Sequence, residues 1–234
     1  MPAWARPSLI LVMGDSLSAA YGIETSQGWV GLLRKRLAQR GYDYSVINAS
    51  ISGETSAGGL TRLPLELAQY RPALVILELG ANDGLRGLSL GAMQQNLEKM
   101  ITLSQHAGAK VLLIGILLPP NYGPRYTQEF AAIYPRLAKK QHVPLVPFLL
   151  AGIAEHRELM QADGMHPLAS AEPRVLDNVW QYLQSLLIKS RPPESSPAKF
   201  NVRGMLIPAY SVFSPDERRG PWYPPSPVSV APAV

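Results

Sequence analysis

The segment LVILELGANDG, residues 74–84, contains the two features that decide the fold of this chain. Its first part, Leu74–Leu79, is an apolar run of strand length, which is typical of a parallel strand covered on both faces. Its second part, Gly80–Gly84, is polar and rich in turn residues, so the strand ends there. The segment therefore predicts a buried strand that delivers Asn82 and Asp83 to one edge of a sheet.

The same pattern recurs along the chain, because other apolar runs of strand length alternate with segments of helical period. The further predicted strands are Leu9–Met13, Tyr44–Asn48, Lys110–Leu117 and Leu145–Phe148. One helical stripe runs from Leu90 to Ile101, and another, from Leu176 to Leu187, closes the domain. Five strands and about five helices predict a three-layer α/β/α sandwich built on a parallel sheet.

Composition excludes several classes of function. The chain has 234 residues, of which 47% are hydrophobic, no cysteine, and a net charge of +5. The absence of cysteine excludes zinc–thiolate sites, iron–sulfur clusters and thiol catalysis. The basic residues form no stripe with interleaved aromatic residues, so no nucleic-acid partner is expected. The run Leu9–Met13 is too short for a signal sequence or a membrane span, so neither an export signal nor stable membrane insertion is expected.

The composition changes after Ile188, where proline becomes frequent. Ten of the 22 prolines lie within residues 191–234. Proline lacks the amide hydrogen that helices and sheets require. We therefore predict a folded domain over residues 1–189 and a proline-rich tail over residues 190–234 that is disordered or loosely packed.

Five residues at the predicted strand ends, and in the loop before the last helix, combine into a candidate catalytic site. A hydroxyl nucleophile needs a base, and the base needs a partner that orients it. Ser16, His166 and Asp163 have these three chemistries. The oxyanion of acyl transfer needs hydrogen-bond donors, which the backbone amides of Ser16 and Gly53 and the side chain of Asn82 can provide.

Each of these residues also has a plainer interpretation. Ser16 would serve as the N-cap of the first helix, His166 as a loop histidine, Asn82 as part of a turn, and Gly53 as a tight bend. Their coincidence at successive strand ends favours a site. No two histidines have metal-ligand spacing, so no metal is expected. The G-x-S-x-G elbow, the dinucleotide fingerprint and the P-loop are missing from the sequence.

Four segments together resemble the SGNH hydrolases, also called GDSL esterases/lipases. These are GDSLSA (residues 14–19), NASISG (48–53), ELGANDGLRG (78–87) and LPPNYG (118–123), and the likeness spans residues 8–187. Within that family the motifs are most similar to those of bacterial thioesterases, lysophospholipases and arylesterases. The resemblance implies a flavodoxin-like sheet of order 2-1-3-4-5 and hydrolysis of esters and thioesters through an acyl-enzyme, with no cofactor.

Carried across by motif, the resemblance implies roles for the same residues. Ser16 becomes the nucleophile, His166 the base and Asp163 its orienting acid, while Ser16, Gly53 and Asn82 form the oxyanion hole. It also implies contact with the acyl chain for one loop, namely Leu118, Pro119, Pro120, Asn121 and Tyr122.

The resemblance further implies a small-molecule acyl ester or thioester as the partner, and we expect a monomer. It implies a periplasmic or secreted protein, which is at odds with the short apolar run near the N-terminus. One departure is Glu54, where relatives commonly have Asp.

Two alternatives of other classes remain at this point. One is a metal-dependent phosphoesterase that uses Asp15, Asp83, Asp163 and His166 around a divalent cation. The other is a non-catalytic module that binds lipid or glycan on the same scaffold.

Overall fold

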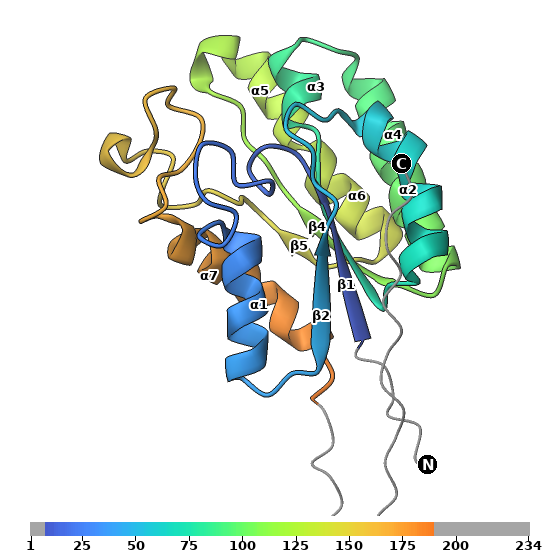
Figure 1. Cartoon of the computed structure of the whole chain (residues 1–234). Coiled ribbons are helices and arrows are strands. Elements are labelled where there is room, and N and C mark those ends of the chain that lie inside the picture. The colour runs from blue at the N-terminus through green and yellow to red at the C-terminus, as the bar shows by residue number, and fades with distance from the viewer. Residues whose placement is uncertain (1–7, 190–234) are drawn as a thin grey trace, which may run out of the picture. The chain divides into compact units, whose positions relative to one another are not determined.

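A computed structural model describes residues 8–189 of the chain (Figure 1). The predicted proline-rich tail, residues 190–234, lies outside the described residues. No helix within residues 8–189 is both long and apolar enough to cross a membrane.

A five-stranded parallel sheet forms the centre of this region. Its strands are β1 (Ser8–Gly14), β2 (Tyr44–Asn48), β3 (Leu74–Glu78), β4 (Lys110–Ile114) and β5 (Leu145–Val146). They lie in the order β2-β1-β3-β4-β5, and every neighbouring pair is parallel. The predicted fold class and strand order are confirmed.

Helices connect the strands. They are α1 (Trp29–Gln39), α2 (Ser56–Tyr70), α3 (Ala81–Leu85), α4 (Leu90–His106), α5 (Pro124–Ala131), α6 (Ile133–Gln141) and α7 (Glu172–Leu183). Three short 3-10 helices are η1 (Pro120–Tyr122), η2 (Arg157–Leu159) and η3 (Gln184–Leu186).

The helices cover the sheet on both faces and so make three layers. Figure 1 shows α1 and α7 on one side of the strands and α2, α4 and α6 on the other. Alternate residues of β1 point into the two cores: Ile10 and Val12 pack with the α1/α7 layer, and Leu11 and Met13 with the opposite layer. Both faces of the inner strands β1, β3 and β4 are thus buried, which explains why these strands read as continuous apolar runs.

The structure differs from the prediction at the far edge of the sheet. Strand β4 ends at Ile114 rather than Leu117, and β5 ends at Val146 rather than Phe148. The Gly115 amide still donates to the Val146 carbonyl (2.8 Å), but the Gly115 carbonyl accepts from the Leu149 amide (3.0 Å) instead of the Phe148 amide that a regular parallel ladder would use, so the regular pairing ends there. The backbone of Gly115 lies so close to that of Pro147 that a Cβ at position 115 would be 2.3 Å from the Pro147 carbonyl oxygen. The segments that follow β4 and β5 no longer belong to the sheet and form walls of the cavity described below.

There are also more helices than predicted in the described region. The segment between β4 and β5 holds two helices, α5 and α6, and the polar cluster after β3 forms the five-residue helix α3. Asn82 therefore lies in the first turn of a helix rather than in a simple turn.

Candidate active site

The turn that carries Ser16 follows β1 directly. Residues 16–22 form consecutive turns, with hydrogen bonds from the Ala19 amide to the Asp15 carbonyl (2.9 Å) and from the Tyr21 amide to the Ser16 carbonyl (3.1 Å). Helix α1 begins only at Trp29, and its N-cap residue is Gly28. Ser16 is therefore not the N-cap of the first helix, and its hydroxyl is available for other contacts.

The loop that carries Asp163 and His166 is closed on itself. The Gln161 amide donates to the His166 carbonyl (2.7 Å), and the Gly164 amide donates to the Gln161 carbonyl (3.0 Å). Gly164 has φ +69°, a conformation that suits glycine, at the tip of this turn. The turn brings the Asp163 carboxylate back onto its own chain, where Oδ1 accepts from the amides of Met165 (2.9 Å) and His166 (3.1 Å).

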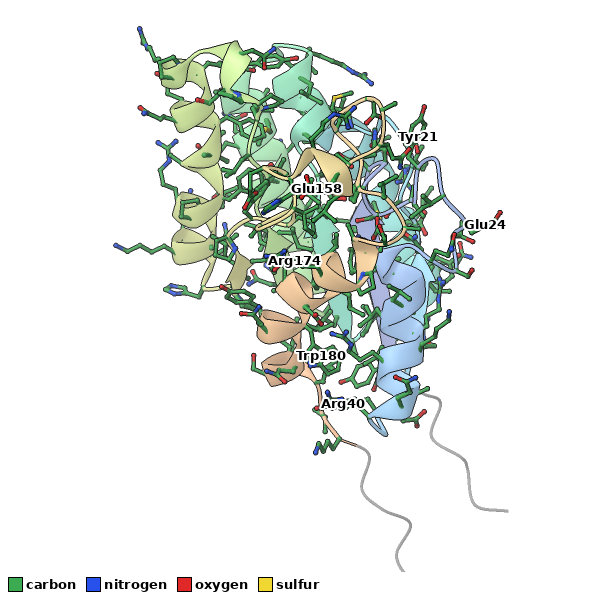
Figure 2. The ribbon with its side chains drawn as sticks, turned by 90° about the vertical axis from the view of Figure 1, so that its left-hand side faces the viewer. Tyr21, Glu24, Arg40, Glu158, Arg174 and Trp180 are labelled. Carbon is green, nitrogen blue, oxygen red and sulfur yellow. The ribbon has the colours of Figure 1, made fainter. Side chains whose placement is uncertain are left out.

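The structure brings Ser16, His166 and Asp163 into one line of hydrogen bonds. His166 Nδ1 lies 2.7 Å from Asp163 Oδ2, and His166 Nε2 lies 2.8 Å from Ser16 Oγ, across 150 positions of sequence. The ring of Tyr21 packs on the imidazole, with ring centroids 4.5 Å apart and planes inclined by 37°. Figure 2 shows Tyr21 at the end of the molecule opposite Arg40 and Trp180.

The charge on Asp163 is stabilised by its hydrogen bonds. Partial burial alone would raise the pKa of this carboxyl, but the Met165 amide, the His166 ring and the His166 amide outweigh it and lower the pKa to about 2. Asp163 is therefore ionised throughout the neutral range. An anion in this position holds the imidazole in the tautomer that leaves Nε2 as an acceptor for the Ser16 hydroxyl.

The three predicted oxyanion donors lie in the segments that follow three strands: Ser16 after β1, Gly53 after β2 and Asn82 after β3. The amides of Ser16 and Gly53 donate no hydrogen bond to any other residue of the described range. Gly53 has φ +79°, and its carbonyl accepts from Arg86 Nη2 (3.0 Å). The Asn82 side chain donates through Nδ2 to Asp15 Oδ2 (3.3 Å).

A cavity of about 660 Å³ opens beside Ser16. Ser16, Asn82 and His166 line it, whereas Gly53 and Asp163 are not among its lining residues. Of the predicted acyl-contacting loop, Leu118, Pro119 and Pro120 line the cavity and Asn121 and Tyr122 do not. The Tyr122 hydroxyl instead donates to the Leu85 carbonyl (3.0 Å).

Sequence analysis missed the opposite wall of the cavity. This wall is apolar and comes from the segment after β5 and from the loop of His166, through Phe148, Leu149, Leu150, Ala154, Met160 and Met165. The available signal was the apolar run that continues past Pro147, where the strand cannot continue. The described residues form a pocket whose walls are mostly hydrocarbon, with a polar corner of Asp15, Ser16, Asn82 and His166 and with Glu155 on the opposite wall.

The carboxylates of the metal-dependent alternative are already engaged. Asp83 accepts from the Ser56 amide (2.8 Å) and the Ser56 hydroxyl (2.6 Å) and so holds the start of α2. Asp15 accepts from the Leu17 amide (3.1 Å) and from Asn82. Within residues 8–189, no group of three or more His, Asp or Glu side chains is arranged to hold a metal ion.

The remaining histidines of the described range lie outside this site. His106 ends α4, and His142 caps the end of α6 with φ +53°. His156 Nδ1 lies 3.2 Å from Glu158 Oε1 in an exposed pair. That pair has the same chemistry as the His166–Asp163 pair but has no serine beside it, so it offers a matched control.

Comparison with known proteins gives a consistent result. Residues 12–171 match the model of the GDSL-like lipase/acylhydrolase family. The chain is 57% identical over 183 residues to the esterase TesA of Pseudomonas aeruginosa, which covers 78% of this chain and 91% of that protein. It is 44% identical over 183 residues to thioesterase 1/protease 1/lysophospholipase L1 of Escherichia coli, with 78% and 86% covered. A crystal structure of TesA superposes with a TM-score of 0.76 at 58% identity and covers 77% of this chain and all of that one.

Proposed function

The chain belongs to the GDSL-like lipase/acylhydrolase family, and on that premise we propose how its residues divide the work of ester and thioester hydrolysis. Ser16 is the nucleophile, His166 the general base and acid, and Asp163 the residue that orients His166. The amides of Ser16 and Gly53 and the carboxamide of Asn82 bind the oxyanion. The observation that carries the proposal is the continuous hydrogen-bonded line from Asp163 through His166 to Ser16, at 2.7 and 2.8 Å.

In the acylation step, Ser16 Oγ attacks the carbonyl carbon of the substrate while His166 Nε2 takes the hydroxyl proton. The carbonyl oxygen becomes an oxyanion, which three hydrogen-bond donors stabilise more strongly than the neutral carbonyl. The intermediate then collapses, the bond to the alcohol or thiol breaks, and His166 returns its proton to the leaving group. The result is an ester of the acyl group with Ser16.

Deacylation repeats these steps with water as the nucleophile. His166 takes a proton from a water molecule while the water oxygen attacks the carbonyl carbon of acyl-Ser16. His166 then returns this proton to Ser16 Oγ as the carboxylic acid leaves. Asp163 stays ionised and stabilises the imidazolium that forms twice in each cycle. No group other than these side chains and amides is needed for the proton balance.

The cavity supports an acyl chain as the part of the substrate that is bound. Its walls are mostly hydrocarbon away from the corner of Ser16, with Glu155 as the exception, so an acyl chain placed there buries apolar surface while its carbonyl meets the polar corner. The named activities of the relatives, esterase, thioesterase and lysophospholipase, share an acyl group and differ in the leaving group. We infer that this chain likewise selects its substrates by the acyl group.

The proposal includes the organisation of the chain. Residues 1–189 form the hydrolase domain, and the monomer is the active unit because Ser16, His166 and Asp163 all come from one chain. Deletion of residues 191–234 should leave kcat and KM for a p-nitrophenyl ester within about twofold of the full chain. Loss of folding on deletion would contradict this division.

The decisive test replaces the nucleophile. Ser16→Ala should abolish p-nitrophenyl-ester hydrolysis and labelling by a fluorophosphonate, while the thermal unfolding transition stays close to that of the parent protein. Ser185→Ala, which removes a surface hydroxyl bonded only to the Tyr182 carbonyl, should retain both properties. Turnover that persists in Ser16→Ala and stops with a chelator would favour the phosphoesterase, and ligand binding without any turnover would favour the binding module.

A second experiment tests whether the acyl chain binds in this cavity. Ala154→Phe narrows the cavity, and kcat/KM for long-chain esters should fall by roughly tenfold while acetate esters are unaffected, because hydrophobic pockets discriminate by about 1–3 kcal/mol per methylene. Ala57→Phe, on the exposed face of α2, is the control. Equal losses for short and long chains would contradict this placement.

A further inference from the structure

Asp15 is a buried carboxyl group that the proposed reaction does not use. It precedes Ser16, it is 1% exposed, and it has no opposite charge paired with it. Its two oxygens have different partners: Oδ1 accepts from the Leu17 amide at 3.1 Å, and Oδ2 accepts from Asn82 Nδ2 at 3.3 Å. Asp15 therefore connects the turn of Ser16 with a side chain that lies 67 positions away on α3.

The chemistry of this contact selects one orientation of the Asn82 carboxamide. A carboxamide has a donor NH2 group on one side and an acceptor oxygen on the other, and it can turn about its last side-chain bond. An ionised carboxylate only accepts hydrogen bonds, so it attracts the NH2 group and repels the oxygen. One Nδ2 hydrogen points to Asp15, and the second has no acceptor among residues 8–189. That second hydrogen is the one available to a substrate oxygen.

A second buried carboxyl group holds Asp15 from beneath. Glu78 Oε2 accepts from the Ser18 hydroxyl (2.7 Å) and from the Asp15 amide (3.3 Å), while Glu78 Oε1 is buried and unpartnered among the described residues. Burial raises the pKa of Glu78 well above its ordinary value, and the charge of Asp15 raises it further. Both effects make Glu78 hard to ionise while Asp15 carries its charge.

Asp15 remains ionised at neutral pH. Burial raises its pKa to about 6, and hydrogen bonds from Leu17 and Asn82 and the nearby His166 limit the rise. Of the two carboxyl groups, Asp15 and Glu78, the one that contacts Asn82 therefore carries the negative charge.

We propose that Asp15 is a positioning residue for the reaction, which holds the Asn82 carboxamide with its NH2 group toward the oxyanion. The proposal rests on the role of Asn82 in the proposed function. Asp15 also lines the cavity, but an ionised carboxylate cannot donate to the oxyanion, so we expect its effect to pass through Asn82 and to be felt in the transition state rather than in substrate binding.

The test is a double-mutant cycle on kcat, with Asp15→Asn, Asn82→Ala and the double variant. Asn82→Ala should lower kcat by about 10²- to 10³-fold, because it removes one oxyanion donor. In Asp15→Asn the Leu17 amide keeps the new amide oxygen on its own side, so the new NH2 group faces Asn82 and favours the reversed carboxamide. We therefore expect kcat to fall by roughly 10- to 100-fold, part of the loss in Asn82→Ala, with KM within about twofold. The double variant should be no worse than Asn82→Ala alone, within about threefold. A product of the two single losses would overturn the proposal, as would a kcat for Asp15→Asn within twofold of the parent.

Asp15→Ser separates the two contacts of Asp15. A serine at this position can still accept from the Leu17 amide two residues on, but it is too short to reach Asn82. The proposal expects it to lose as much kcat as Asp15→Asn. Full kcat in Asp15→Ser would show that the Leu17 contact alone matters. If Asp15→Asn does not fold, Asp15→Ser replaces it in the double-mutant cycle with Asn82→Ala.

Ser18→Ala is the matched control for the cycle. It disturbs the same buried layer through Glu78 but has no contact with Asn82, so its effect on kcat should multiply with that of Asn82→Ala. The failure of this inference is distinguishable from failure of the proposed function: retained turnover in Ser16→Ala overturns the function, whereas an inactive Ser16→Ala together with an uncoupled Asp15→Asn overturns only the role of Asp15.

Discussion

Two carboxylates flank Ser16 and His166, and their surroundings are opposite. Asp15 lies beneath the nucleophile turn, buried on the strand framework, and burial raises its pKa to about 6. Asp163 lies on a surface loop with about a third of its side chain exposed, and its hydrogen bonds lower its pKa to about 2. Burial therefore opposes the negative charge of Asp15, whereas local hydrogen bonds stabilise the negative charge of Asp163.

The two sides are also built differently. The Asp15 side rests on the central strands β1 and β3, with Glu78 and Gly14 tightly packed beneath it. The Asp163 side is one short turn whose hydrogen bonds are almost all within the loop. We therefore expect changes on the buried side to affect stability as well as catalysis, and changes on the loop side to affect chiefly catalysis.

The largest expected effect comes from the loop side. Asp163→Asn replaces an acceptor with an amide that stabilises the wrong tautomer of His166, so kcat should fall by roughly 10³- to 10⁴-fold. The free energy of unfolding at pH 7 should fall by no more than about 2 kcal/mol, which is the contribution that the lowered pKa of Asp163 makes above pH 4. Glu158→Gln, in the exposed His156–Glu158 pair, should keep kcat within twofold. A large loss of stability in Asp163→Asn would contradict the division between the two sides.

The second effect is opposite pH dependence of stability on the two sides. The folded pKa of Asp15 is raised above its ordinary value of 3.8, so the folded state holds a proton that the unfolded state loses, and stability falls as pH rises from about 4 to about 6. The folded pKa of Asp163 is lowered, so its contribution is present above about pH 4 and is lost as pH falls toward 2.

Urea unfolding across this pH range measures both contributions. Relative to Asp15→Asn, the parent protein should lose on the order of 3 kcal/mol between pH 4 and pH 7. Relative to Asp163→Asn, it should lose stability only below pH 4. Parallel curves for the parent and Asp15→Asn between pH 4 and pH 7 would refute the assignment of a raised pKa to Asp15.

The third effect tests the packing under the nucleophile turn. A Cβ at Gly14 would lie 2.6 Å from Glu78 Oε2 and 2.7 Å from both Cβ and Oγ of Ser18, so Gly14→Ala should cost about 1–3 kcal/mol of unfolding free energy. Gly91→Ala, in helix α4, meets only Ser89 Oγ at 3.7 Å and should be neutral or stabilising. Equal stabilities of the two variants by urea unfolding would show that the buried side is not tightly packed.

The smallest expected effect concerns Tyr21, which covers the imidazole from the solvent side. Its ring is half exposed, and an aromatic contact of this kind contributes about 0.5–1.5 kcal/mol. Tyr21→Ala should therefore lower kcat by roughly 2- to 10-fold, while Tyr21→Phe should retain the parent value. A loss in Tyr21→Phe as large as in Tyr21→Ala would assign the effect to the hydroxyl instead of the ring.

Sequence analysis predicted the central strands well, and its errors have a common cause. β1 and β3 are buried on both faces and leave continuous apolar runs, and their bounds agree with the prediction within one residue. The edge strand β2 has only Val46 buried, yet its bounds also agree. β4 and β5 end early because their hydrogen-bond register slips after Val146, where the Leu149 amide rather than the Phe148 amide donates to the Gly115 carbonyl. Such a slip depends on a neighbour in space rather than on the run itself. The same apolar residues then line the cavity, which explains why half of that pocket was missed.

The amino-acid sequence alone determined the layer architecture and the chemical types at the strand ends, because burial on both faces and turn chemistry are local properties. Only the tertiary structure decided which of those groups meet. The contacts of Ser16 with His166 and of Asp15 with Asn82 join residues 150 and 67 positions apart. Their geometry follows from strand order and register, and these are set by the packing of the whole sheet, since no short segment contains both partners.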